Sequence, residues 1–244
     1  MRESFDDTWQ LLSSIETPDD SFGYENCHDL FKTASSVKNG TIVEIGSWYG
    51  RSSICLGATA GENGNIVYCI DPWLEKFSAD IECVSRRKIF QKWRGSIEKS
   101  GHMESMKPLM GASIEVRKEW DERRQIDLLF IDGMHNFRDD TIEVTQELSD
   151  TFEIEGWKIK GVFYPINEKR KIRLPEFGVG VDYSAWAPLV KPGGYIAMHD
   201  IHADEWPAVA RVWEEEIKSN RHLWHVESER HNMGIARKIA QVSI

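Results

Sequence analysis

Four side chains that could exchange protons with a bound molecule follow two apolar segments of the sequence. Asp132 and His135 lie at and just beyond the end of IDLLFIDG (126–133), and His199 and Asp200 end GGYIAMHD (193–200). If the two segments are neighbouring strands of a parallel sheet, their carboxyl ends meet at one edge and bring these side chains together. Imidazoles suit proton removal near neutral pH, so this edge is a candidate reaction site.

Short apolar runs suited to such strands recur along the chain, with helical segments between them. Runs rich in Val, Ile and Leu without strict alternation are typical of strands buried on both faces of a parallel sheet. The alternation predicts an α/β fold with a doubly wound sheet. The runs are TIVEIG (41–46), NIVYCID (65–71), 126–133 and 193–200.

The flanking segments complete this arrangement. The pattern predicts helices over 23–37 and 203–219, the second with Pro207 in its first turn, where a missing N–H costs little. LWHVESE (223–229) and NMGIARK (232–238) predict a closing antiparallel hairpin with its turn at His231 and Asn232.

One segment interrupts the alternation. Residues 151–181 follow a helix expected after His135 and contain β-prone stretches on both sides of PINEKR, with basic residues around it. Long insertions in compact domains are often functional, so this segment is either a solvated hairpin or a lid-like hairpin over a substrate. We expect one domain over 1–244, with an N-terminal helical segment at 1–39.

Composition limits the classes of partner. The chain has 244 residues, 41% of them hydrophobic, and a formal charge of −10, which disfavours nucleic acid and anionic membrane as partners. No run approaches the length of a membrane span, and the four cysteines form no C-x-x-C pair. We expect a cytoplasmic protein. Its ten tryptophans could include some at a homo-oligomer interface, and oligomeric state stays open.

The stretch VEIGSWYGRSS (43–53) ends a predicted strand and carries glycines four residues apart. Gly46 and Gly50 let the backbone approach a ligand, but the bulky Trp48 and Tyr49 exclude the small turn of a G-x-G-x-x-G dinucleotide loop. The loop therefore suits a nucleoside-like ligand without phosphates. Asp71, which ends the next strand, is placed to bind ribose hydroxyls.

These motifs together resemble those of class I S-adenosylmethionine-dependent methyltransferases. VEIGSWYGRSS, CIDPW, LLFIDGMHNF and PLVKPGGYIAMHD match successive motifs of that group. The nearest branch carries D-G-x-H and P-G-G-x-I-x-x-H-D patterns and includes small-molecule and sugar O-methyltransferases and the cephalosporin hydroxylase-like group. The resemblance implies a Rossmann-like sheet of seven strands, mostly parallel with the antiparallel hairpin at its end.

The resemblance also implies roles for individual residues on the cofactor side. It places Gly46, Ser47 and Gly50 near the methionine part of S-adenosyl-L-methionine, Glu44 under its amino end, and Asp71 at the ribose. Ser113 is a candidate beside the adenine, although this chain has Ala112 where the family commonly has Asp. The cofactor set implied is Glu44, Gly46, Ser47, Gly50, Asp71, Pro72, Trp73, Ser113 and Asp132.

On the acceptor side, Asp132, His199 and Asp200 match the positions that bind a divalent cation in metal-dependent O-methyltransferases. The imidazole at 199 stands where the family has a carboxylate, which makes Mn²⁺ or a softer ion more plausible than Mg²⁺. His135 is the leading candidate for general base, with a structural histidine as the alternative, and Asp132 is the second catalytic candidate.

The sequence thus predicts methylation of a small hydroxylated acceptor, possibly sugar-containing, with divalent-metal assistance. The basic insertion on an acidic protein suggests an anionic acceptor. N- or C-methylation stays open. The alternatives are an NAD-dependent oxidoreductase on a similar sheet, disfavoured by the missing G-x-G-x-x-G loop, and a non-catalytic cofactor-binding protein.

Overall fold

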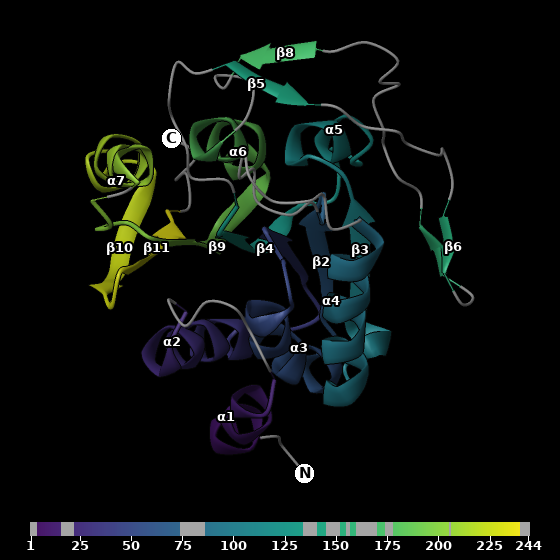
Figure 1. The fold of residues 1–244 in the computed structure, drawn as a ribbon. Coiled ribbons are helices and arrows are strands. Elements are labelled where there is room, and N and C mark those ends of the chain that lie inside the picture. Colours follow the sequence, from purple (N-terminus) through teal and green to yellow (C-terminus); the bar gives the residue numbers. More distant parts are fainter. Residues whose placement is uncertain are drawn as a thin grey trace.

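The computed structural model describes residues 4–15, 22–73, 86–133, 141–144, 152–154, 157–159, 170–173, 178–204 and 206–239 (Figure 1). Its centre is a seven-stranded sheet in the order β10-β11-β9-β4-β1-β2-β3. The strands are β1 (Thr41–Ile45), β2 (Ile66–Asp71), β3 (Met106–Met110), β4 (Ile126–Ile131), β9 (Val190–His199), β10 (Trp224–Arg230) and β11 (Met233–Lys238).

The predicted mixture of parallel and antiparallel pairs is confirmed. All pairs from β3 across to β9 are parallel, and β11 runs antiparallel to both β9 and β10. The hairpin turns at His231 and Asn232, as the sequence predicted. Both residues have a positive φ. Chain order reverses between β1 and β4, which is where ligands bind in open α/β sheets.

The edge strand β3 was not among the segments predicted from apolar runs. Its residues alternate between buried and more exposed positions, and Pro108 lies in the middle of the strand. Proline is tolerated at a sheet edge because no outer neighbour needs its missing N–H. Because buried and exposed residues alternate and a proline lies among them, β3 lacks the continuous apolar run by which the other parallel strands were predicted.

Helices cover both faces of the sheet (Figure 1). The bounds of the helical elements are α1 (Phe5–Ser13), α2 (Tyr24–Ser35), α3 (Arg51–Asn63), α4 (Arg86–Ser100), the 3-10 turns η1 (Met103–Ser105) and η3 (Ala187–Leu189), α5 (Ser113–Lys118), α6 (Val179–Trp186), α7 (Pro207–Arg211) and the π-helical η4 (Val212–Lys218). Both predicted helices are present, and Pro207 is the first residue of α7.

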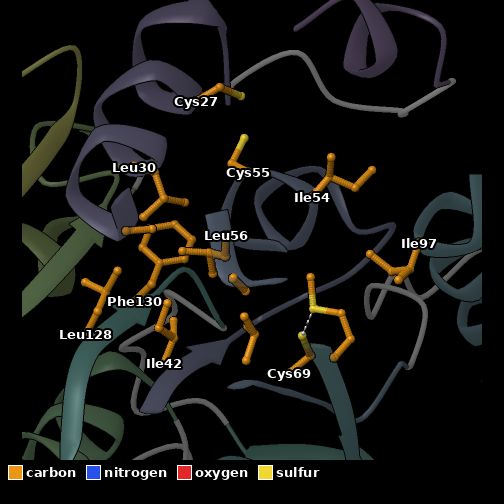
Figure 2. Packing of buried hydrophobic residues seen from close by; sticks show 14 of the residues in the cluster. Cys27, Leu30, Ile42, Ile54, Cys55, Leu56, Cys69, Ile97, Leu128 and Phe130 are labelled. Carbon is orange, nitrogen blue, oxygen red and sulfur yellow. Dashed lines mark hydrogen bonds between the residues drawn. The ribbon is translucent and has the colours of Figure 1, made fainter. Parts of the chain in front are cut away.

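Two hydrophobic cores lie on opposite faces of the sheet because successive strand residues point to opposite sides. Ile42 belongs to the core shared with α1 to α4, and Val43 to the core shared with α5 to η4. Figure 2 shows part of the first core, where Leu30, Leu56 and Phe130 pack together. The three cysteines in the described part are buried and free.

Four short strands between β4 and α6, three of them in the predicted insertion, form two small sheets apart from the main one. β5 (Thr141–Val144) pairs with β8 (Arg170–Arg173), and β6 (Phe152–Ile154) pairs with β7 (Trp157–Ile159), both antiparallel. A single hairpin turning at PINEKR is therefore not the pairing found. The helix expected after His135 is a strand at 141–144, where three of four residues are β-branched and favour extended backbone.

No helix among the described ranges is long and apolar enough to cross a membrane.

Candidate functional site

The predicted site lies where β9, β4, β1 and β2 end side by side at the carboxyl edge of the sheet. Four loops meet there: 46–50 after β1, 72–73 after β2, 132–133 after β4 and 200–202 after β9. Parallel strands deliver these loops to one edge, so residues far apart in sequence become neighbours.

Gly46 brings the first loop against the end of β4. Its φ is +90°, and a Cβ atom added there would lie 2.1 Å from the carbonyl oxygen of Asp132. The backbone N–H of Gly46 donates to Ile70 O at 2.9 Å, and that of Asp132 donates to Ile45 O at 2.8 Å. Only glycine has both the conformation and the space required, so Gly46 sets the spacing between the loop and Asp132.

Glu44 supports this loop from below. Its carboxylate is fully buried and accepts hydrogen bonds from Ser47 Oγ at 2.5 Å, Ser52 Oγ at 2.6 Å and Ser53 Oγ at 2.5 Å. Burial raises the pKa of Glu44, while the three hydroxyl bonds oppose that shift. The structure therefore joins Glu44 to the loop and to the first turn of α3, instead of exposing it toward a ligand.

Asp71 holds the same loop from the end of β2. Its Oδ2 accepts from the backbone N–H groups of Ser47 at 2.9 Å and Trp48 at 2.8 Å, and its Oδ1 accepts from the N–H of Trp73. Burial raises the pKa of Asp71 against the lowering effect of these bonds. Its described contacts are to the backbone of both loops, and ribose binding remains a prediction.

Trp48 and Trp73 have left-handed φ angles of +39° and +45°, which are uncommon for bulky residues. Trp73 Nε1 donates to Trp48 O at 3.0 Å, and its ring is buried between Phe90 and Trp93. The Trp73 ring thus serves as packing under the loops, with its neighbour Pro72 partly exposed.

Gly50 ends the loop and begins α3. It has a φ of +93°, donates its N–H to Ser47 O at 2.7 Å and accepts from Ile54 N as the helix N-cap. Five of the nine predicted cofactor residues thus lie in the loop after β1 or hold it by hydrogen bonds: Gly46, Ser47 and Gly50 in the loop, and Glu44 and Asp71 bonded to it.

Asp132, His199 and Asp200 form the second part of the site. Each offers one ligand atom, and these atoms lie within 4.8 Å of one another. His199 Nδ1 lies 3.3 Å from Asp132 Oδ1 and 3.5 Å from Asp200 Oδ2. The sequence prediction that these three side chains meet is confirmed by this geometry.

The charge state of the cluster follows from its burial. His199 is 2% exposed, and Phe22 packs edge-on against its ring. Burial would lower the pKa of His199, but the carboxylates of Asp132 and Asp200 outweigh it and raise the pKa to about 10. Without a cation, the imidazolium supplies the positive charge between the two carboxylates.

Two oxygens and a nitrogen are a donor set that fits a divalent cation such as Mn²⁺, and it suits Mg²⁺ less because Mg²⁺ prefers oxygen ligands. The cluster also touches the loop of residues 46–50, which we call the cofactor loop for its predicted role, through the backbone of Asp132, against which Gly46 packs.

Asn232 in the β10–β11 turn holds the third member of the cluster, and sequence reasoning did not identify it. Its Nδ2 donates to Asp200 Oδ1 at 2.7 Å, and its Oδ1 accepts from the N–H of His202 at 2.7 Å. Its backbone carbonyl accepts from Ile201 at 3.3 Å. These bonds support Asp200 at a φ of +61°. Asparagine is common in turns, so the sequence marked Asn232 as a turn residue but gave no sign of its bond to Asp200.

Ser113 begins α5, just after the loop that follows β3. Its hydroxyl donates to Asp182 Oδ1 in the first turn of α6. Asp182 is another residue that sequence reasoning missed, although an acid four residues before the buried Trp186 is an unusual helix pattern. The predicted base His135 lies outside the described residues.

Comparisons with known proteins agree with this arrangement. A family model described as "Methyltransferase domain" matches residues 43–157, which include the loop after β1 and Asp132. Among the solved structures that share the fold are three methyltransferases. The O-methyltransferase TomG from Streptomyces achromogenes, in complex with SAM, is 13% identical, with 98% of this chain and 91% of that chain covered and a TM-score of 0.56.

The O-methyltransferase from Bacillus cereus, in complex with SAH, is 14% identical, with 97% of this chain and 90% of that chain covered and a TM-score of 0.54. The SAH-bound methyltransferase PaMTH1 from Podospora anserina is 12% identical, with 98% and 89% covered and a TM-score of 0.57.

At these identities the solved structures establish the Rossmann-like methyltransferase fold. The family match over residues 43–157 and this fold together support a class I S-adenosylmethionine-dependent methyltransferase.

Proposed function

We propose that the protein transfers the methyl group of S-adenosylmethionine to a hydroxyl oxygen of a small acceptor, with a divalent cation bound by Asp132, His199 and Asp200. One observation carries the proposal: the backbone of Asp132 packs on Gly46 of the cofactor loop while its side chain belongs to the acidic cluster. The cofactor loop and the cluster therefore share a residue.

Methyl transfer from a sulfonium is a direct displacement, so the protein must chiefly align the acceptor oxygen with the methyl group and weaken its O–H bond. A bound cation would supply the second effect by lowering the pKa of an acceptor hydroxyl. Asp132, His199 and Asp200 would hold that cation. Glu44 and Asp71 would keep the loop of Gly46 and Ser47 in place against the cofactor.

The predicted role of His135 as general base belongs to this proposal, because D-G-x-H sets it three residues after Asp132. We further propose that the basic segment around Lys169, Arg170 and Lys171 favours an anionic acceptor, such as a carboxylate- or phosphate-bearing sugar. Charge reversal at these three residues should then raise the KM for the acceptor and leave the Kd for S-adenosylhomocysteine unchanged.

A cytoplasmic location is also part of the proposal. It is supported by the buried free thiols of Cys27, Cys55 and Cys69, which fit a reducing compartment. The oxidoreductase alternative is not favoured, because the loop after β1 carries Trp48 and Tyr49 where a dinucleotide loop needs small residues.

The test is a methyl-transfer assay with isotopically labelled S-adenosylmethionine and a panel of catechols, glycosides and hydroxy acids. Each acceptor is tested with EDTA, Mg²⁺ or Mn²⁺. We expect label on an oxygen of at least one acceptor, activity lost with EDTA and restored best by Mn²⁺. Transfer to nitrogen or carbon, or full activity in EDTA, would contradict the proposal.

Asp132→Asn is the matching variant and should lose activity by about 100-fold or more, since it removes a charge from the reacting site. Asp121→Asn is the control, because Asp121 pairs with Arg123 in the turn before β4, away from the cluster. If the protein binds S-adenosylhomocysteine but transfers no methyl group, and Asp132→Asn leaves that binding unchanged, it is a non-catalytic cofactor-binding protein.

A further inference from the structure

We propose that Asp182 determines the specificity of the cofactor site for adenine, by committing the Ser113 hydroxyl hydrogen to itself and leaving Ser113 as a hydrogen-bond acceptor. The inference deepens the cofactor half of the proposed function and rests on adenosyl binding beside Ser113. It concerns a residue outside the loops of β1 and β2.

The first step is the position of the carboxylate. Asp182 is 5% exposed, and its Oδ1 accepts the Ser113 hydroxyl. Its Oδ2 lies 3.4 Å from where a Cβ atom would stand on Gly133. Asp182 therefore lies between the segment that follows β3 and the turn that follows Asp132, both at the ligand edge of the sheet.

The second step is the origin of the carboxylate beside Ser113. Ala112, the residue just before Ser113, has no polar side chain to pair with it. The structure brings a buried carboxylate to that serine from α6 instead. The negative charge beside Ser113 thus comes from a residue 69 positions away in sequence.

The third step is the direction of the hydrogen bond. A serine hydroxyl has one hydrogen and two lone pairs, and a carboxylate accepts only. With its hydrogen given to Asp182, half-buried Ser113 offers a ligand only lone pairs. The 6-amino group of adenine is a donor and satisfies them, whereas the 6-oxo group of hypoxanthine would place two acceptors face to face.

The competing explanation is that the bond only fastens α5 to α6, as the bond from Arg117 Nε to Ala185 O does at 2.9 Å. A fastening role changes thermal stability and weakens all cofactor analogues alike. A role in recognising the base changes the ratio of the Kd values of an amino and an oxo analogue. That ratio therefore separates the two explanations.

The experiment measures by calorimetry the Kd of S-adenosylhomocysteine and of S-inosylhomocysteine, its analogue with hypoxanthine. The wild-type protein should prefer the adenine compound by tenfold or more, about the value of one satisfied hydrogen bond against one unsatisfied acceptor. Ser113→Ala should weaken the adenine compound about tenfold, leave the inosine compound unchanged, and so remove most of the preference.

Asp182→Asn should bring the preference close to one, because its amide can donate to Ser113 and release the hydroxyl hydrogen toward a 6-oxo group. Binding of the inosine compound should improve in this variant. Ser184→Ala is the control on the same helix, since its hydroxyl bonds to Gly180 O and is exposed. It should keep the wild-type ratio.

The proposal is overturned if the wild-type protein binds both compounds equally, or if Ser113→Ala and Asp182→Asn lower the melting temperature but retain the wild-type ratio. Should Asp182→Asn not fold, Ser113→Ala still overturns the proposal if it retains the wild-type ratio. Failure of the wild-type protein to bind either compound would refute the cofactor site itself, a result distinct from binding both without preference.

Discussion

The cofactor loop and the acidic cluster lie at the same edge of the sheet but are held in different ways. In the loop, both buried carboxylates have donors from the protein: Glu44 has three hydroxyls and Asp71 has three backbone N–H groups. In the cluster, two carboxylates face one imidazole, and the Nε2 atom of His199 is buried with no hydrogen-bond partner among the described residues.

This difference shows that the polar groups of the loop are satisfied without a ligand, whereas those of the cluster are not. Satisfied buried hydrogen bonds give the loop a single geometry before the cofactor arrives. The cluster carries two negative charges against one positive charge, so a divalent cation would both replace the imidazolium proton and balance the carboxylates. We therefore expect mutations in the loop to lower the free energy of unfolding. Mutations around the cluster should instead lower the affinity for a divalent cation.

The largest effect is expected from Gly46→Ala. The added Cβ meets the Asp132 backbone at 2.1 Å, and a φ of +90° is unfavourable for alanine. We expect a loss of about 3–5 kcal/mol in the free energy of unfolding, in the range of severe steric substitutions. Chemical denaturation measures it. Gly95→Ala is the control, since nothing lies within 4 Å of its Cβ position in α4, and it should not destabilise. Equal stability of the two variants would show that the loop can move away from β4.

Ser53→Ala should come next. The Ser53 hydroxyl donates to Glu44 and accepts from Trp93 Nε1 at 3.1 Å, so its removal leaves two buried polar groups without that partner. We expect a loss of about 2 kcal/mol, measured in the same way. Ser13→Ala removes an exposed hydroxyl in α1 and should change stability by less than about 0.5 kcal/mol. If Ser53→Ala is as mild as its control, the loop is not held through Glu44.

Asn232→Gly tests the support of the cluster. Glycine accepts the positive φ at this turn position but removes the amide that bonds Asp200 and His202. We expect Mn²⁺ affinity to fall about tenfold, the lower end of the effect of groups that orient metal ligands, with little loss of stability. His231→Gly changes the neighbouring turn residue, also at positive φ, and should retain the wild-type Mn²⁺ affinity. A variant that loses stability but not affinity would make Asn232 purely structural.

The last prediction concerns the proton that His199 must release when a cation binds. Because the pKa of His199 is raised to about 10, its imidazole is protonated at pH 7 to 9 and must lose that proton to bind a cation. Mn²⁺ binding should release roughly one proton, and affinity should rise up to about tenfold per pH unit until pH approaches the pKa. Calorimetry in buffers of different ionisation enthalpy measures the release. Binding without proton release would exclude His199 as a ligand.

Much of this architecture was predictable from local sequence. Buried apolar runs marked β1, β2, β4 and β9, and the spacing of strand-end acids identified Asp71, Asp132 and Asp200. These signals are strong because a strand covered on both faces must be continuously apolar, and a polar residue at its end then stands out. The edge strand β3, with Pro108 and alternating exposure, lacked that signal.

What only the tertiary structure decided is which polar groups satisfy one another. No local pattern indicates that Glu44 receives three seryl hydroxyls, that Asn232 supports Asp200, or that Asp182 takes the Ser113 hydrogen. The last two bonds join residues 32 and 69 positions apart. A hydrogen bond depends on distance and direction in space, and sequence periodicity specifies only the face on which a residue lies.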